Sequence, residues 1–175
     1  MKSENLSRPS IFIIGIIAGL LFSSAIVFFL TKKQLPSPSA KASYHVNIFN
    51  DTATNTYFRR VLFTGKNSQL VVMSIPPGGE VGAETHKYTE QTLFFLSGKG
   101  EGFLNSDTFP VVSGDVVVVV PGTKHNFKNT GTEDLKIYTV YAPPNHIDGR
   151  IHKTKTDADA DIADEAVGER KLICQ

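Results

Sequence analysis

The chain has 175 residues, of which 41% are hydrophobic and 20% are charged, an ordinary composition for a globular protein. This length allows one domain with an extension and leaves too few residues for two hydrophobic cores. The formal net charge of +1 and the lack of a basic run interleaved with aromatic residues argue against nucleic-acid binding. The only cysteine, Cys174, rules out an intrachain disulfide.

The first expected element is a transmembrane helix at residues 11–30, IFIIGIIAGLLFSSAIVFFL, which contains no charged side chain. A helix of that length rises about 30 Å, the thickness of the hydrocarbon layer. The alternative is a cleaved signal peptide, because Lys2 and Arg8 precede the run and a small-x-small site follows at residues 40–42. The run exceeds the signal-peptide core of about 7–15 residues, which favours an uncleaved single-pass anchor.

The segments on either side of this anchor are an N-terminal tail, residues 1–10, and a linker rich in Pro, Ser and Lys, residues 31–43. The side of the membrane on which the domain lies stays open. Lysines after the run favour the cytoplasm by the positive-inside rule, whereas the short tail and signal-like layout favour export.

Residues 44–155 are predicted to form an all-β domain. Strand-like runs rich in Val, Ile, Phe, Tyr and Thr recur between turn signals, and no run shows sustained helical periodicity. The runs are YHVNIF (44–49), YFRRVLF (57–63), QLVVMSI (69–75), TLFFLSG (92–98), DVVVVVP (115–121) and LKIYTVYA (135–142). Such a pattern is typical of a sandwich or barrel. We interpret GKGEG (98–102) as a hairpin turn, and the acidic tail, residues 156–175, as either a short helix or a solvated end.

Four candidate metal ligands lie in two segments of this domain, three of them before the fourth predicted strand and one after the fifth. Glu84 and His86 share one face of an extended segment, because side chains alternate along a strand. Gln91 begins the next strand, and His125 follows the valine-rich strand and a Pro-Gly corner. Two imidazoles, a carboxylate and an amide oxygen suit first-row divalent metals, although each residue alone could be structural.

The first of two spaced motifs surrounds these residues. Gly78 is followed after five residues by Glu84-Thr85-His86, then after four residues by Gln91 and after six more by Gly98.

The second motif contains the other histidine. Gly114 is followed after five residues by Val120-Pro121-Gly122, and then by His125 and Asn129. The two motifs together cover about half of the predicted domain.

These segments resemble the paired motifs of the cupin superfamily. Three positions depart from the family pattern: Glu84 replaces the first His of the pair, Gln91 replaces the Glu, and Pro121 falls one position late. The variant is similar to a subgroup of small bacterial cupins that also carry YAPP (here residues 141–144) and DG…HKTK (here residues 148–155).

The resemblance implies a cupin-type double-stranded β-helix, or jelly-roll barrel, with one internal metal site lined by Glu84, His86, Gln91 and His125. The divalent ion expected is Fe, Mn, Zn or Ni. Because the fold hosts many activities, two functions stay open: an enzyme acting on a small oxygenated molecule, a sugar or keto acid, and a non-catalytic module binding a sugar or small ligand. No catalytic residue is assigned. The expected partners are that small molecule, the membrane through the N-terminal helix and, as an open option, a second copy of the chain.

Motif spacing also decides between two neighbouring residues. A gap of three residues after His86 would select Glu90, and a gap of four selects Gln91. Only the choice of Gln91 leaves the six residues before Gly98 that the first motif has. We therefore expect Gln91 to be the ligand and Glu90 to lie outside the site. His146 and His152 are placed on a C-terminal strap across the surface and outside the ligand set.

The anchor at residues 11–30 predicts that the full-length protein stays with the membrane. After cell fractionation and a carbonate wash, we expect it in the membrane pellet, because a 20-residue apolar helix is not extracted by high pH. Release of a mature form beginning at Ser43 would show a cleaved signal peptide instead.

Overall fold

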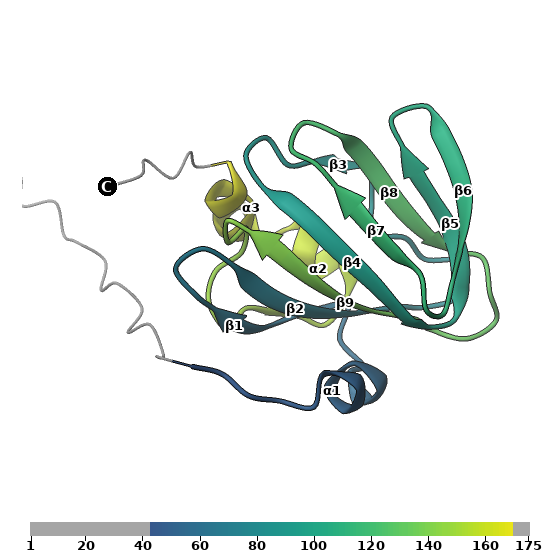
Figure 1. The fold of residues 1–175 in the computed structure, drawn as a ribbon, viewed down its shortest axis with the longest axis horizontal. Coiled ribbons are helices and arrows are strands. Elements are labelled where there is room, and N and C mark those ends of the chain that lie inside the picture. Colours follow the sequence, from purple (N-terminus) through teal and green to yellow (C-terminus); the bar gives the residue numbers. More distant parts are fainter. Residues whose placement is uncertain (1–42, 170–175) are drawn as a thin grey trace, which may run out of the picture. The chain divides into compact units, whose positions relative to one another are not determined.

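The computed structural model describes residues 43–169, and the elements below all lie within that range. Ten strands and three short helices follow one another along the chain (Figure 1). The strands are β1 (Arg59–Thr64), β2 (Gln69–Ile75), β3 (Glu84–Thr85), β4 (Glu90–Ser97), β5 (Lys99–Leu104), β6 (Asp107–Val112), β7 (Val116–Val119), β8 (Lys124–Asn129), β9 (Leu135–Ala142) and β10 (Ile151–His152). The helices are α1 (Ile48–Thr54), α2 (Lys155–Asp159) and α3 (Ile162–Gly168).

Two antiparallel sheets face each other across the core. One has six strands in the order β10-β1-β2-β9-β4-β7, and the other has four in the order β3-β8-β5-β6. Figure 1 shows the two sheets diverging from the end where β4 runs into β5. The predicted strands at residues 69–75 and 135–142 match β2 and β9, which pair along the full length of β2. The jelly-roll fold expected from the sequence is confirmed for the described residues.

The core between the sheets is built by alternation along the strands. In β4 and β9 every second side chain is buried, and Leu93, Ile137 and Tyr141 have no exposed surface. The intervening residues face outward. Strand β2 is buried on both faces, because α1 packs against the outer side of the strands β2, β9 and β4. The barrel thus provides a rigid frame for inward-facing polar side chains at its open end.

The predicted strand at residues 44–49 is wrong, since residues 44–47 have no regular secondary structure. Helix α1 begins at Ile48, and the side chain of Asn47 caps it by accepting a hydrogen bond from the backbone N–H of Asn50 at 3.1 Å. Asparagine is among the preferred N-cap residues, and Asp51 in the first turn favours the same end of the helix. The local capping signal therefore prevails over the β-branched and aromatic composition of the run.

The predicted turn at residues 98–102 is only partly correct. Gly98 makes the turn with a φ of 83°, and β5 begins at the next residue. The other two glycines of the run are needed for packing between strands. A Cβ on Gly100 would lie 2.4 Å from the carbonyl oxygen of Lys128, and one on Gly102 would lie 2.7 Å from the ring of Phe109.

The C-terminal segment is helical where the structure describes it. Helix α2 starts with a capping box between Thr154 and Asp157, and α3 is capped by Asp161. Within residues 43–169 no helix is long and apolar enough to span a membrane. The predicted anchor at residues 11–30 lies outside the described residues, as does the linker except for Ser43.

Candidate metal centre

Three predicted ligands converge because of the pairing between β3 and β8. Glu84 lies directly opposite His125 in this antiparallel ladder. The Oε1 atom of Glu84 is 3.4 Å from Nε2 of His125 and 3.3 Å from Nε2 of His86. One donor atom from each residue lies within 4.8 Å of the other two. The expected convergence of Glu84, His86 and His125 is therefore present in the structure.

The short strand β3 is positioned by the chain on both sides of it. Gly82, with a φ of 102°, precedes it and donates its backbone N–H to the side chain of Asn126 on β8. After the strand, the carbonyl of His86 accepts a hydrogen bond from the backbone N–H of Gly122, in the turn before β8. These two bonds hold β3 against β8 although it has only two residues.

Gln91 supplies the fourth polar atom, and it is almost fully buried at the start of β4. Its Oε1 lies 3.1 Å from Nε2 of His125, and its Nε2 donates to the hydroxyl of Tyr141 at 2.9 Å. Burial raises the pKa of Tyr141 far above its ordinary value, so its hydroxyl stays neutral. Glu90 is exposed, so the structure brings Gln91 and not Glu90 to the cluster.

The protonation of His125 shows what the cluster lacks. Its Nδ1 lies 3.0 Å from the carbonyl of Thr123, which can only accept, so Nδ1 carries a proton. In the neutral ring Nε2 is then an acceptor, yet it faces the oxygens of Gln91 and Glu84. Burial lowers the pKa of His125, but the carboxylate of Glu84 outweighs burial and raises it. A cation between these acceptors, either a proton on Nε2 or a metal ion, would satisfy them.

The two other candidate ligand atoms of the cluster lie on His86 and Glu84. Within residues 43–169, Nε2 of His86 and Oε1 of Glu84 are buried without a hydrogen bond, since their mutual contact lacks hydrogen-bond geometry. Burial by itself would raise the pKa of Glu84, but His125, His86 and the charge of Arg59 outweigh burial and hold it well below its ordinary value. Buried polar atoms almost always have a partner, so these orphaned atoms fit a bound cation. Two imidazoles and a carboxylate are a donor set for a first-row divalent metal.

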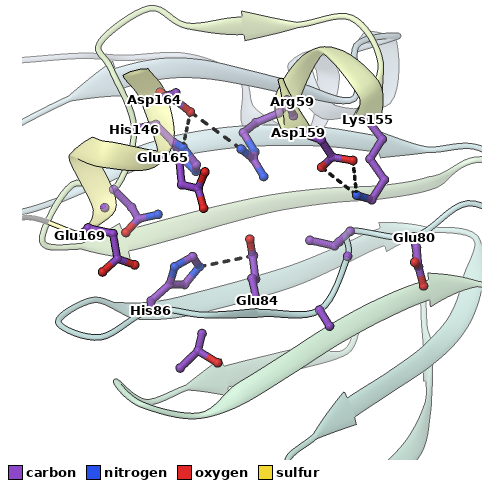
Figure 2. Close-up of a pocket in the computed structure, with 17 residues that line it drawn as sticks. Arg59, Glu80, Glu84, His86, His146, Lys155, Asp159, Asp164, Glu165 and Glu169 are labelled. Atoms are coloured by element: carbon purple, nitrogen blue, oxygen red, sulfur yellow. Dashed lines mark hydrogen bonds and ion pairs between the residues drawn. The ribbon is translucent and has the colours of Figure 1, made fainter. Parts of the chain in front are cut away.

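A pocket of about 590 Å³ opens beside the cluster (Figure 2). Figure 2 shows Glu84 and His86 on one side, with Arg59, His146 and Asp164 on the other. Its lining comes from β1, the segment around β3, the loop after β9, and helices α2 and α3. The C-terminal segment expected to be a short helix or a solvated end therefore forms one wall of the pocket.

Two histidines of the C-terminal region lie elsewhere than the sequence pattern predicts. His146, expected on a surface strap, is only 6% exposed and lines the pocket, although it is not in the ligand cluster. Its Nδ1 donates to Oδ2 of Asp164 at 2.8 Å. His152 is also buried, and it contacts Asp161 at 3.0 Å outside the pocket lining. Only long-range packing brings these residues together, so strand periodicity gives no signal for them.

Comparisons with known proteins agree with this architecture. The model of the Cupin domain family matches residues 71–141. The uncharacterized protein YrkC of Bacillus subtilis is 41% identical over 136 residues, which are 74% of this chain and 70% of YrkC. The crystal structure of BH2720 from Bacillus halodurans aligns with a TM-score of 0.66 and 36% identity, over 71% of this chain and 96% of that one.

A more distant match supports the fold alone. A Klebsiella pneumoniae protein with a double-stranded β-helix domain aligns with a TM-score of 0.52 and 22% identity. The alignment covers 64% of this chain and all of the Klebsiella chain.

The burial of Gln91 and the exposure of Glu90 predict opposite effects of substitution on metal affinity. Gln91→Ala should weaken Zn²⁺ binding by roughly 10-fold, because it removes an oxygen beside His125. Gln91→Glu should keep or tighten binding by adding a negative oxygen donor. Glu90→Ala serves as the matched control and should change little. Zn²⁺ titration against a competing chelator measures all three, and loss of affinity in Glu90→Ala alone would contradict this placement.

Proposed function

This chain belongs to the cupin superfamily, and from that membership we propose that it holds a divalent metal ion in its barrel and acts on a small oxygenated molecule in the adjoining pocket. Glu84, His86 and His125 would hold the ion, with the amide oxygen of Gln91 beside them. When bound, such an ion acts as a Lewis acid that polarises a carbonyl or hydroxyl oxygen.

The charge of the donor set supports a ligand rich in oxygen. Glu84 is the only carboxylate among the four donors, so a divalent ion would keep a net positive charge. A residual positive charge attracts oxygen atoms that are negative or become negative during a reaction. The pocket beside the cluster is large enough for a small sugar or keto acid.

The observation that favours an enzyme is the pair formed by His146 and Asp164. Burial by itself would raise the pKa of Asp164, but hydrogen bonds from His146 and Ile147 outweigh burial and lower it, so the carboxylate is ionised. Burial lowers the pKa of His146 more than its bond to Asp164 raises it, and the charge of Arg59 adds to the lowering. His146 is therefore a neutral imidazole at neutral pH, with its Nδ1 proton held by Asp164.

The other ring nitrogen of His146, Nε2, is then unprotonated. It is buried without a hydrogen-bond partner among the described residues, and the ring lines the same pocket as Glu84 and His86. Tyr141 packs edge-on against both His146 and His86, which fixes the two imidazoles on neighbouring sides of one ring. A positioned neutral histidine with an ionised orienting carboxylate is the usual arrangement of a general base. We therefore favour removal of a proton from a carbon next to a carbonyl.

Attachment to a membrane through residues 11–30 is part of the same proposal. Its support is the length and apolar character of that run, which would hold the barrel and its pocket close to a bilayer.

Proton removal predicts deuterium exchange that depends on His146. The Zn²⁺-loaded protein is incubated in D₂O with a panel of small ketoses, aldoses and keto acids, and loss of the C–H signal is followed by NMR. His146→Ala should slow exchange by about 10²–10⁴-fold. The exchange rate should rise with pH as His146 loses its proton. It should reach its plateau at a pH below the ordinary histidine pKa, because the pKa of His146 is lowered.

The control for this experiment is His152→Ala. His152 is also buried and also contacts an aspartate, but it lies outside the pocket lining, so exchange should be unaffected. If the metal-loaded protein binds members of the panel and exchanges none of them, the non-catalytic binding module is correct. If His146→Ala exchanges as fast as the unchanged protein, His146 is not the base.

A further inference from the structure

Arg59 is a buried cation with no carboxylate within hydrogen-bond distance among residues 43–169. It lies on β1, its side chain is 10% exposed, and its Nε is buried without a hydrogen-bond partner among residues 43–169. The nearest carboxylate oxygen is Oδ2 of Asp164, 3.8 Å from Nη1, which is beyond hydrogen-bond length. Buried guanidinium groups are normally fixed by two parallel bonds to a carboxylate. Arg59 lacks that pairing.

Asp164 is not placed to complete this pairing. Its Oδ2 accepts from His146 at 2.8 Å, and its Oδ1 accepts from the backbone N–H of Ile147 at 2.7 Å. Both oxygens are thus already engaged by groups other than Arg59. Asp164 supplies a counter-charge that makes burial of Arg59 tolerable and leaves the guanidinium donors available.

The guanidinium faces the metal centre. Arg59 lines the same pocket as Glu84 and His86, and Figure 2 shows it extending from the opposite wall toward them. The guanidinium also lies 5.5 Å from the ring of the buried Phe58, which supports its position. A ligand in the pocket would therefore meet a fixed planar cation on one side and the metal-binding residues on the other.

The remaining charged groups of the pocket limit what can bind there. Lys155 donates hydrogen bonds to both carboxylate oxygens of Asp159, at 2.8 and 2.7 Å. Among the described lining residues, Arg59 is therefore the cation without a carboxylate at hydrogen-bond distance. The exposed side chains toward helix α3 and the segment before β3 are acidic: Glu80, Glu165 and Glu169. This acidic rim disfavours a ligand with a phosphate or several carboxylates, and it tolerates one carboxylate held deep at Arg59.

We propose that Arg59 binds the carboxylate of a small keto or hydroxy acid, whose neighbouring oxygen faces the cluster of Glu84, His86 and His125. This inference rests on the proposed function and narrows it from oxygenated molecules in general to small acids with one carboxylate. A neutral sugar would offer the guanidinium of Arg59 only uncharged oxygens, which accept weaker hydrogen bonds than a carboxylate does.

Matched ligand pairs test the proposal on the full-length chain, purified in detergent and loaded with Zn²⁺. Calorimetry compares pyruvate with hydroxyacetone, and glycolate with ethylene glycol, so that each pair differs in its carboxylate. We expect the acid of at least one pair to bind roughly 10-fold or more tightly than its neutral partner, because a charge-assisted bond is lost in the neutral molecule. If no acid binds more tightly than its neutral partner, the proposal is wrong.

Variants then assign the preference to Arg59. Arg59→Gln should remove the difference between acid and neutral ligand, and Arg59→Lys should keep only part of it, because an ammonium cannot form the two-bond fork. The matched control is Arg60→Gln, the same charge change at the next position of β1, whose side chain points to the opposite sheet face. Full acid preference in folded Arg59→Gln would overturn the proposal.

Zn²⁺ affinity, measured on the same samples, separates this inference from the proposed function. Normal Zn²⁺ binding without an acid preference refutes the role of Arg59 and leaves the metal centre intact. Acid binding that depends on Arg59 in a protein that takes up no Zn²⁺ refutes the metal-dependent function and leaves the carboxylate site.

Discussion

The pairing of Glu84 with His125 across β3 and β8 is the interaction on which the site depends. It places an ionised carboxylate against two imidazoles in a largely buried space, and His86 and Glu84 each keep a buried atom without a hydrogen bond among the described residues. Each unsatisfied buried polar group costs about 1–3 kcal/mol, and more when it is charged. A cation between the three side chains would remove that cost, so metal binding and the stability of the barrel's open end would be coupled.

The C-terminal segment links this centre to a second set of charges. Asp164 on α3 holds His146 in one tautomer and lies near the buried Arg59. Because Asp164 also accepts the backbone N–H of Ile147, docking of α3 fixes the loop after β9 at the same time. The positions of His146, the proposed base, and of Arg59, the proposed carboxylate-binding residue, thus depend on the same helix. Neither residue belongs to the metal-binding cluster.

Much of the barrel and the ligand cluster follows from local sequence pattern. The alternation of apolar and polar residues in β9 and the apolar run of β2 predict both strands with the correct bounds. The spacing of the glycines relative to His86 and His125 identifies the cluster. Strand β5 is not predicted because glycines such as Gly100 and Gly102 are typical of turns. In the structure they lie inside the strand, where a Cβ would collide with neighbouring strands. The contact of His146 with Asp164 joins residues 18 positions apart and depends on where α3 packs, so no periodicity reveals it.

Anomalous diffraction from crystals of the protein tests the central claim most directly. The protein is purified without chelators from zinc-supplemented cells, and data are collected on both sides of the zinc absorption edge. We expect an anomalous peak about 2.0–2.3 Å from Nε2 of His86, Nε2 of His125 and a carboxylate oxygen of Glu84. A peak bound by other side chains, or metal-replete protein with no peak between these three residues, would contradict it.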